Sequence, residues 1–191
     1  PNIKSSKNKA LDLLNVLIEK QTQLVIDWMR VGFIHGVMNT DNMSISGETI
    51  DYGPCAFMDS YDPKTVFSSI DQLGRYAYDN QPKITKWNLT RFAECLIPLI
   101  SKNEDEAIKL ATEALDKFEK NYETKWLNMM RDKLGLYGED KDDKNLIMEL
   151  LNWMQKKKVD YTNTFIFLMN KTIENSEAYN NADFDLWKIK W

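Results

Sequence analysis

The chain has 191 residues, 43% of them hydrophobic, and 25 basic against 29 acidic residues give a formal charge of −4. This length is enough to bury a hydrophobic core within one domain, residues 1–191. Seven glycines and five prolines are too few for a collagen-like or low-complexity chain, and the mild negative charge argues against a nucleic-acid partner. We therefore expect a mainly α-helical protein.

The chain carries no signal for a membrane or a secretory route. No apolar run approaches the roughly 20 residues that span a bilayer, and the first nine residues are polar. Cys55 and Cys95 lie far apart and form no C-x-x-C pair, so we expect two buried free thiols. These features predict a cytoplasmic protein without a membrane partner. Because the chain starts without Met and ends on Trp191, we also expect a piece of a longer protein.

The first half of the chain changes character after its first helical stretch. Apolar residues recur at spacings of three and four over residues 11–33 and predict one or two amphipathic helices, which Gly32 and Gly36 bring to an end. Alternating residues around a glycine-containing turn then predict a β-hairpin with strands at 43–45 and 49–51. Proline and glycine mark 51–82 as a loop region, where functional sites commonly lie.

The second half is predicted to be helical almost throughout. Residues 180–191 are polar and then aromatic, which predicts a strand or a docking tail that covers an edge of the core. Before this tail, helical periodicity predicts helices at 87–100, 104–134 (one helix or two, ending at Gly135), 143–157 and 162–173.

The polar residues around the predicted hairpin suggest a metal site. His35, the only histidine, opens a run that ends at Asn42, and Asp51 begins an Asp-x-Gly turn that ends at Gly53. This spacing is typical of kinase-type sites, in which a loop Asn and the Asp of such a turn hold Mg²⁺. Mg²⁺ prefers carboxylate and amide oxygens. Asn42 and Asp51 are therefore the candidate metal ligands, and a turn residue and a capping residue are the alternative reading.

One part of the kinase-type pattern is missing. Two residues after the histidine, where such loops carry the Asp that accepts the proton of the attacking hydroxyl, this chain has Val37. Asp41 is the nearest carboxylate and is the candidate catalytic base, with a cap or a solvated loop residue as the alternative. For His35 we expect a structural hydrogen bond to loop backbone.

Two blocks of sequence, 28–45 and 49–54, resemble the signature of the selenoprotein O family, the protein adenylyltransferase pseudokinases. The resemblance implies a kinase-like fold, with this chain as its C-terminal part and the hairpin carrying the metal site. It also implies that ATP is held in a flipped orientation and that AMP is transferred to Ser, Thr or Tyr hydroxyls of proteins. Shorter matching blocks extend the resemblance: Gly74–Ala77, Asn80–Pro82, Trp87–Leu89 with Arg91, and Asp160–Thr162 with Thr164–Phe165.

Residue by residue, Asn42 and Asp51 match the metal ligands of the family, for Mg²⁺ or Mn²⁺, and Asp41 matches its proposed base. The phosphate-binding Lys and the other nucleotide-gripping residues belong to an N-terminal lobe that this chain lacks. The resemblance therefore implies that the isolated chain is inactive and that it contacts that lobe. Two rival functions are a kinase-like phosphotransferase and a non-catalytic helical interaction module.

Overall fold

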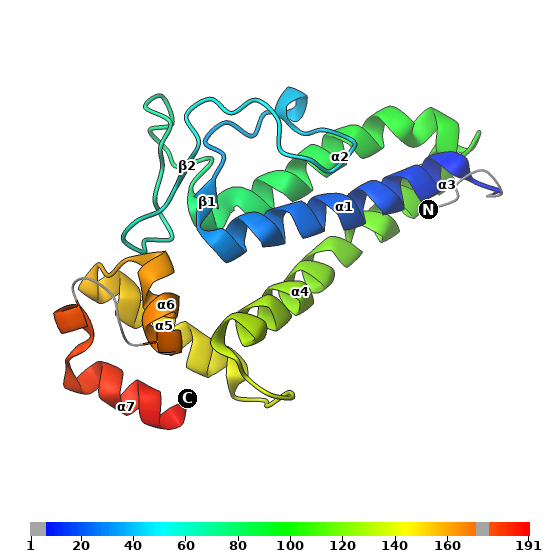
Figure 1. Ribbon diagram of the computed structural model, residues 1–191. Helices are drawn as coiled ribbons and strands as arrows, with labels where there is room; N and C mark the ends of the chain where they lie inside the picture. The colour runs from blue at the N-terminus through cyan, green and yellow to red at the C-terminus, as the bar shows by residue number, and fades with distance from the viewer. Residues whose placement is uncertain (1–6, 171–175) are drawn as a thin grey trace.

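The computed structural model describes residues 7–170 and 176–191, and the mainly α-helical prediction is confirmed (Figure 1). None of the helices in these two ranges is long and apolar enough to cross a membrane. The elements in chain order are α1 (Lys9–Val31), β1 (Phe33–Ile34), β2 (Ala56–Phe57), α2 (Gln81–Ile100), α3 (Glu104–Leu115), α4 (Lys117–Leu134), α5 (Asp143–Lys157), α6 (Tyr161–Asn170) and α7 (Ala182–Lys190), with 3₁₀ turns η2 (Thr40–Asn42), η3 (Tyr78–Asn80) and η4 (Ser176–Tyr179).

The first predicted helical stretch is one helix, α1, with a cap at each end. The side chain of Asn8 accepts a hydrogen bond from the Leu11 amide, and Gly32 ends the helix with a φ of 72°. Glycine adopts this left-handed conformation without steric cost. A Cβ atom at Gly32 would also lie 3.0 Å from the Tyr161 ring, so glycine suits this turn on both counts.

The predicted hairpin is mostly wrong as a pair of strands. It is reduced to one antiparallel bridge between Met43 and Thr49, around a turn in which Gly47 has a φ of 76°. The two-stranded sheet is formed instead by β1 and β2, which flank this region. Part of the physical reason is that the Ser44 carbonyl oxygen accepts from the Gln21 side chain of α1 and from the Gly47 amide, so it is engaged outside any strand ladder.

Most of the later helix predictions are confirmed. Helix α2 begins earlier than expected, at Gln81 rather than Trp87, with Pro82 in its first turn where a missing N–H is harmless. The stretch 104–134 is two helices, α3 and α4, which meet at Asp116. Gly135 caps α4 with a φ of 64°, as predicted. Helix α5 has the predicted bounds.

The C-terminal segment differs from its prediction. The last predicted helix corresponds to α6, and its predicted end, Ile173, lies outside the described residues. Residues 180–191, predicted as a strand or tail, contain helix α7. The Asn181 side chain accepts a hydrogen bond from the Phe184 amide, and this N-cap starts the helix. Phe184 and Trp187 are buried, so the expected cover over the core is present.

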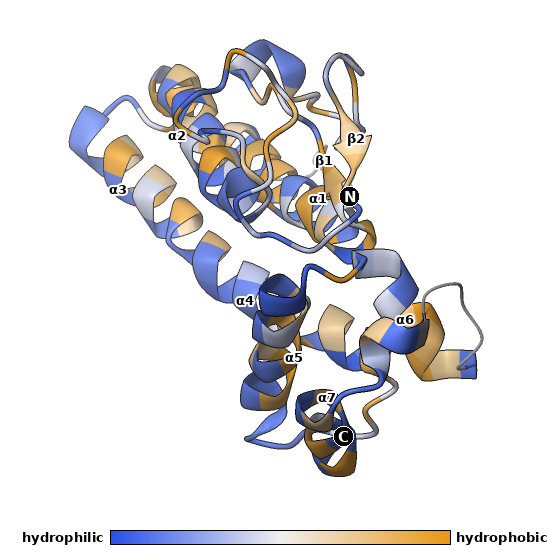
Figure 2. Cartoon of the chain, turned by 90° about the vertical axis from the view of Figure 1, so that its left-hand side faces the viewer, coloured by the Kyte–Doolittle hydropathy of each residue, from blue (hydrophilic) through white to orange (hydrophobic). Residues whose placement is uncertain are grey.

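Two hydrophobic clusters share α1. Its N-terminal half packs with α2 and α3, and its C-terminal half belongs to a cluster that also includes residues of the sheet and of α4 to α7. Figure 1 shows α1 and α2 running side by side while α4 leads away toward the C-terminal helices. In Figure 2 hydrophobic and hydrophilic residues alternate along these helices. The prediction of two buried thiols is wrong, because Cys95 is exposed on α2 and Cys55 is half-buried in the loop before β2.

Candidate functional site

Asp41 and Asn42, the candidate base and one candidate ligand, both lie in the short turn η2. The Asp41 carboxylate is exposed to solvent, whereas Asn42 is half-buried. The Asn42 side chain donates a hydrogen bond from Nδ2 to the carbonyl oxygen of Val37, at 3.0 Å. Because the amide nitrogen is used in this way, the side-chain oxygen is the atom that can bind a cation.

Asp51, the second candidate ligand, has a left-handed backbone with a φ of 56°. Few non-glycine residues adopt this conformation, which costs free energy and is concentrated at functional sites. Its carbonyl oxygen accepts a hydrogen bond from the Gly53 amide at 2.8 Å, which tightens the turn that follows. The bridge between Met43 and Thr49 places Asn42 and Asp51 at the same end of the paired segments.

His35 holds the residue that precedes Asp51. Its side chain is buried, and Nε2 lies 2.8 Å from the carbonyl oxygen of Ile50. A carbonyl oxygen only accepts, so Nε2 carries the proton. The ring also packs against Trp28, with 5.5 Å between ring centroids. The expected structural hydrogen bond of His35 to loop backbone is confirmed.

Four side chains of α1 and α2 anchor the loop that carries the candidate residues. All four point polar atoms into this loop, and none was singled out by residue type alone. Trp28, Gln81 and Asn88 belong to blocks quoted for the family resemblance, and buried polar residues on apolar helix faces are the sequence signal for such anchors. The bonds run from Gln21 Nε2 to Ser44 O (2.6 Å), Trp28 Nε1 to Thr49 Oγ1 (2.9 Å), Gln81 Nε2 to Phe33 O (3.0 Å) and Asn88 Nδ2 to Met38 O (2.9 Å).

The segments that follow His35 and Asp51 also touch. Gly36 has a φ of 84°, and a Cβ atom there would lie 2.9 Å from the ring of Pro54. Only glycine fits this approach without a shift of the neighbouring chain. Both segments therefore pack against each other as well as against the helices.

The donor set suits a hard divalent cation. Asn42 offers an amide oxygen and Asp51 a carboxylate, and Mg²⁺ commonly takes one or two such protein ligands with substrate phosphates and water in its other positions. Within residues 7–170 and 176–191, no group of three or more His, Cys, Asp or Glu side chains is arranged to hold a metal. A site that Asn42 and Asp51 share with substrate phosphates stays the prediction.

Comparison with known proteins decides the family. The family model for protein adenylyltransferase SelO matches residues 1–189. The chain belongs to the SelO family. Its relatives include proteins named protein nucleotidyltransferase YdiU, from Pelagibacter ubique (94% identical over 191 residues), Alkaliphilus metalliredigens (54%) and Alcanivorax borkumensis (53%). Each alignment covers the whole of this chain but only 40%, 39% and 40% of these relatives, respectively. The resemblance seen in the sequence is thereby confirmed at the level of the family.

Proposed function

We propose that this chain is the metal-binding part of an ATP-dependent protein adenylyltransferase, which transfers AMP to Ser, Thr or Tyr hydroxyls. Membership of the SelO family supports nucleotidyl transfer. The observation that carries the proposal is that Asn42 and Asp51 lie at one end of the bridged segments, with the Asn42 side chain bonded to the Val37 carbonyl and the Asp51 carbonyl bonded to the Gly53 amide. The chain is then the C-terminal part of a kinase-like fold in the cytoplasm.

Each candidate residue has a distinct task in this reaction. Asn42 and Asp51 would hold Mg²⁺ or Mn²⁺, which supplies positive charge against the phosphates of ATP. Asp41, exposed beside Asn42, accepts the proton of the substrate hydroxyl. The hydroxyl oxygen forms a bond to the α-phosphorus, the bond from that phosphorus to the bridging oxygen of the β-phosphate breaks, and pyrophosphate leaves. Atoms and charge balance with AMP on the protein.

The nucleotide needs further contacts. The chain spans about 40% of the length of the relatives that it matches. We propose that the residues gripping ATP lie in an N-terminal lobe that contacts this chain, and that the isolated chain is inactive. Detectable AMP transfer by residues 1–191 alone would contradict this part of the proposal.

The main test uses the full-length gene product incubated with ATP, Mg²⁺ or Mn²⁺, and a protein substrate, with modification read as intact mass. We expect an AMP-sized gain that falls by about 100-fold or more in Asp51→Ala, because the substitution removes a cation ligand in the transition state. Asp59→Ala is the matched control, since Asp59 is an exposed acidic residue shortly after β2. It should keep the wild-type rate.

Two other outcomes separate the rival functions. A phosphate-sized gain would indicate a phosphotransferase in place of an adenylyltransferase. No gain, together with equal binding of ATP and metal by the wild type and Asp51→Ala, would indicate a helical interaction module.

The role of Asp41 has a separate test. Asp41→Asn keeps the size of the side chain but cannot accept the proton, so we expect the rate of AMP transfer to fall by about 10²–10⁴-fold. Metal-dependent binding of ATP should stay unchanged in this variant. Loss of binding together with activity would place Asp41 among the binding residues instead.

A further inference from the structure

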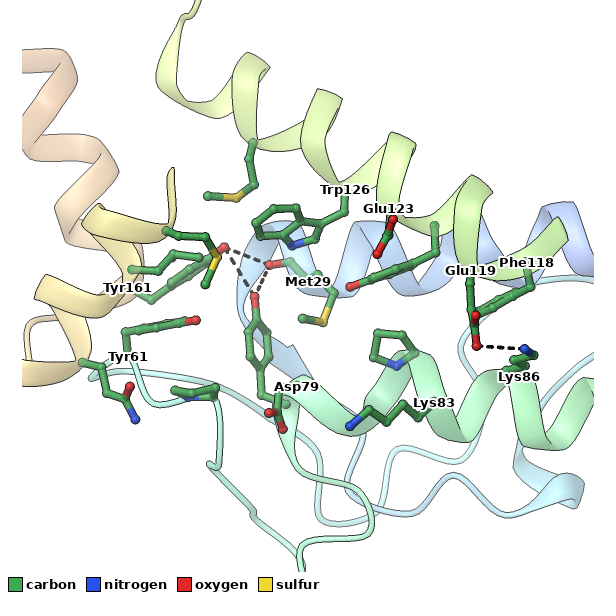
Figure 3. A pocket seen from close by; sticks show the side chains of 18 of the residues that line it. Met29, Tyr61, Asp79, Lys83, Lys86, Phe118, Glu119, Glu123, Trp126 and Tyr161 are labelled. Atoms are coloured by element: carbon green, nitrogen blue, oxygen red, sulfur yellow. Dashed lines mark hydrogen bonds and ion pairs between the residues drawn. The ribbon is translucent and has the colours of Figure 1, made fainter. Parts of the chain in front are cut away.

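A cavity of about 820 Å³ lies between α2, α4, α5 and the segment 61–79, and the end of α1 closes its back (Figure 3). None of its lining residues belongs to the candidate site between β1 and β2. Its volume lies within the range of small-molecule sites, about 300–1,000 Å³. It is therefore a second place in this chain where a ligand fits.

The walls of the cavity are mostly apolar and aromatic. Trp126 and Phe118 contribute rings from α4, and Tyr61 contributes one from the loop that faces them (Figure 3). Met29 and Met130 add flexible, polarisable side chains. Aromatic faces of this kind attract cations within about 6 Å as well as apolar groups.

Four tyrosines meet at the cavity, and their hydroxyls differ. Those of Tyr78 and Tyr161 both donate to the carbonyl oxygen of Met29, at 2.6 and 2.9 Å. Tyr61 is 8% exposed and Tyr122 is half-buried, yet neither hydroxyl has a hydrogen-bond partner among the described residues. Burial raises the pKa of both Tyr61 and Tyr122, so these hydroxyls stay neutral at physiological pH. Among the described residues, the buried polar side-chain atoms without a partner include neither hydroxyl, so both reach solvent and are accessible to a ligand in the cavity.

The charges at the rim favour a cation. Lys86 and Glu119 form an ion pair at 2.8 Å and offset each other. Of the remaining charged residues that line the cavity, Asp79 and Glu123 are acidic and Lys83 is basic, and these three have no ion-pair partner in the ranges that the structure describes. One negative charge is left in excess, next to neutral hydroxyls and aromatic rings.

We propose that this cavity binds a small organic cation, an amine on an aromatic or aliphatic body. The apolar body would fill the space between α4 and α5, and the ammonium group would lie near Asp79 and Glu123 and donate to the Tyr61 or Tyr122 hydroxyl. Two features of the cavity agree on this chemistry, the aromatic walls and the excess of negative charge, and the two accessible hydroxyls can accept from the ammonium group.

Three indole probes with one skeleton test the proposal by calorimetric titration into the full-length gene product. Tryptamine is cationic, tryptophol is neutral and indole-3-acetate is anionic at pH 7. We expect tryptamine to bind at least about fivefold more tightly than tryptophol, and indole-3-acetate to bind most weakly. Equal affinity for all three probes, or no binding of tryptamine at about 1 mM, would overturn the proposal.

Variants locate the binding. Asp79→Asn should reduce the preference for tryptamine over tryptophol. Met148→Trp should weaken the binding of both probes, because Met148 lines the cavity and a larger ring there takes up its space. Met148 is 41% exposed, so the larger ring does not overfill the core. Glu113→Gln is the control, an exposed acidic residue of α3 outside the lining. Unchanged tryptamine affinity in both Asp79→Asn and Met148→Trp, with unfolding midpoints like that of the wild type, would place the binding elsewhere. None of these readouts depends on adenylyl transfer.

Discussion

The loop between β1 and β2 and the C-terminal helices α5 to α7 are held in different ways. In the loop, polar side chains of α1 and α2 bind main-chain oxygens, as Gln81 does at Phe33 and Asn88 at Met38. In the C-terminal helices, rings stack, as Trp153 does on Phe184 with 4.4 Å between centroids. Hydrogen bonds fix the orientation of the groups that they join, whereas apolar packing tolerates small shifts of the side chains. The region that carries the proposed site is therefore the one built from directional bonds.

The largest expected effect on stability lies in the C-terminal helices α5 to α7, the aromatic region. Phe184→Ala should lower the free energy of unfolding by about 3–5 kcal/mol, because the side chain is fully buried and stacks on Trp153 and Trp187. Urea unfolding measures the loss. Ile189→Ala, on the same helix but 81% exposed, should change stability by less than about 0.5 kcal/mol. Equal losses in the two variants would show that α7 is not packed as described.

A smaller loss of stability is expected in the loop between β1 and β2. Gln81→Met keeps the approximate shape of the side chain but leaves the His35 amide and the Phe33 carbonyl buried without their partner. We expect a loss of about 2–3 kcal/mol in urea unfolding, since each such group costs about 1–3 kcal/mol. We also expect faster amide hydrogen exchange between β1 and β2. Gln72→Met, at an exposed loop position, is the control and should leave both measurements unchanged.

Lys133 gives the aromatic region a dependence on pH. It donates to the Arg30 carbonyl oxygen and lies 4.0 Å from the ring centroids of Tyr161 and Phe165. Burial, and then the charge of Arg30, lower the pKa of Lys133 to about 7. Between about pH 7 and pH 9 the unfolded chain therefore binds more protons than the folded one, and the free energy of unfolding rises with pH.

The expected rise over this interval is about 1 kcal/mol after allowance for partial solvent access. It should be absent in Lys133→Met, measured by urea unfolding at several pH values. A wild type and a variant whose stabilities keep a constant difference from pH 7 to pH 9 would refute the lowered pKa.

The smallest expected effect is a gain in stability. Asp51→Gly should stabilise the chain by about 0.5–1 kcal/mol, because glycine adopts the φ of 56° without strain. The same substitution removes the proposed cation ligand and should abolish AMP transfer in the full-length protein. Urea unfolding and intact mass measure the two effects. A destabilised Asp51→Gly would mean that the carboxylate supports the fold and not only the cation.

Local signals in the sequence were sufficient for much of this fold. Helical periodicity and the glycine caps at Gly32 and Gly135 predicted α1 and the end of α4, because these signals act within one turn. Helix α7 was missed because its alternating aromatics masked the Asn181 cap. Asn42 and Asp51 were found from motif spacing, and their role in metal binding stays a prediction. The anchors were missed, since Gln81 and Asn88 bind residues 48 and 50 positions away.

The two tyrosine bonds to Met29 set an order of events during synthesis. Tyr78 follows Met29 by 49 positions, but Tyr161 follows it by 132. At about 5–20 residues per second, Tyr161 leaves the ribosome on the order of 10 s after Met29. Until then the last turn of α1 lacks one of its two tyrosine bonds, whereas the Tyr78 hydroxyl and the anchors from α2 are synthesised well before Tyr161. The loop with the candidate residues is thus the part that can settle first, and the aromatic region closes behind it.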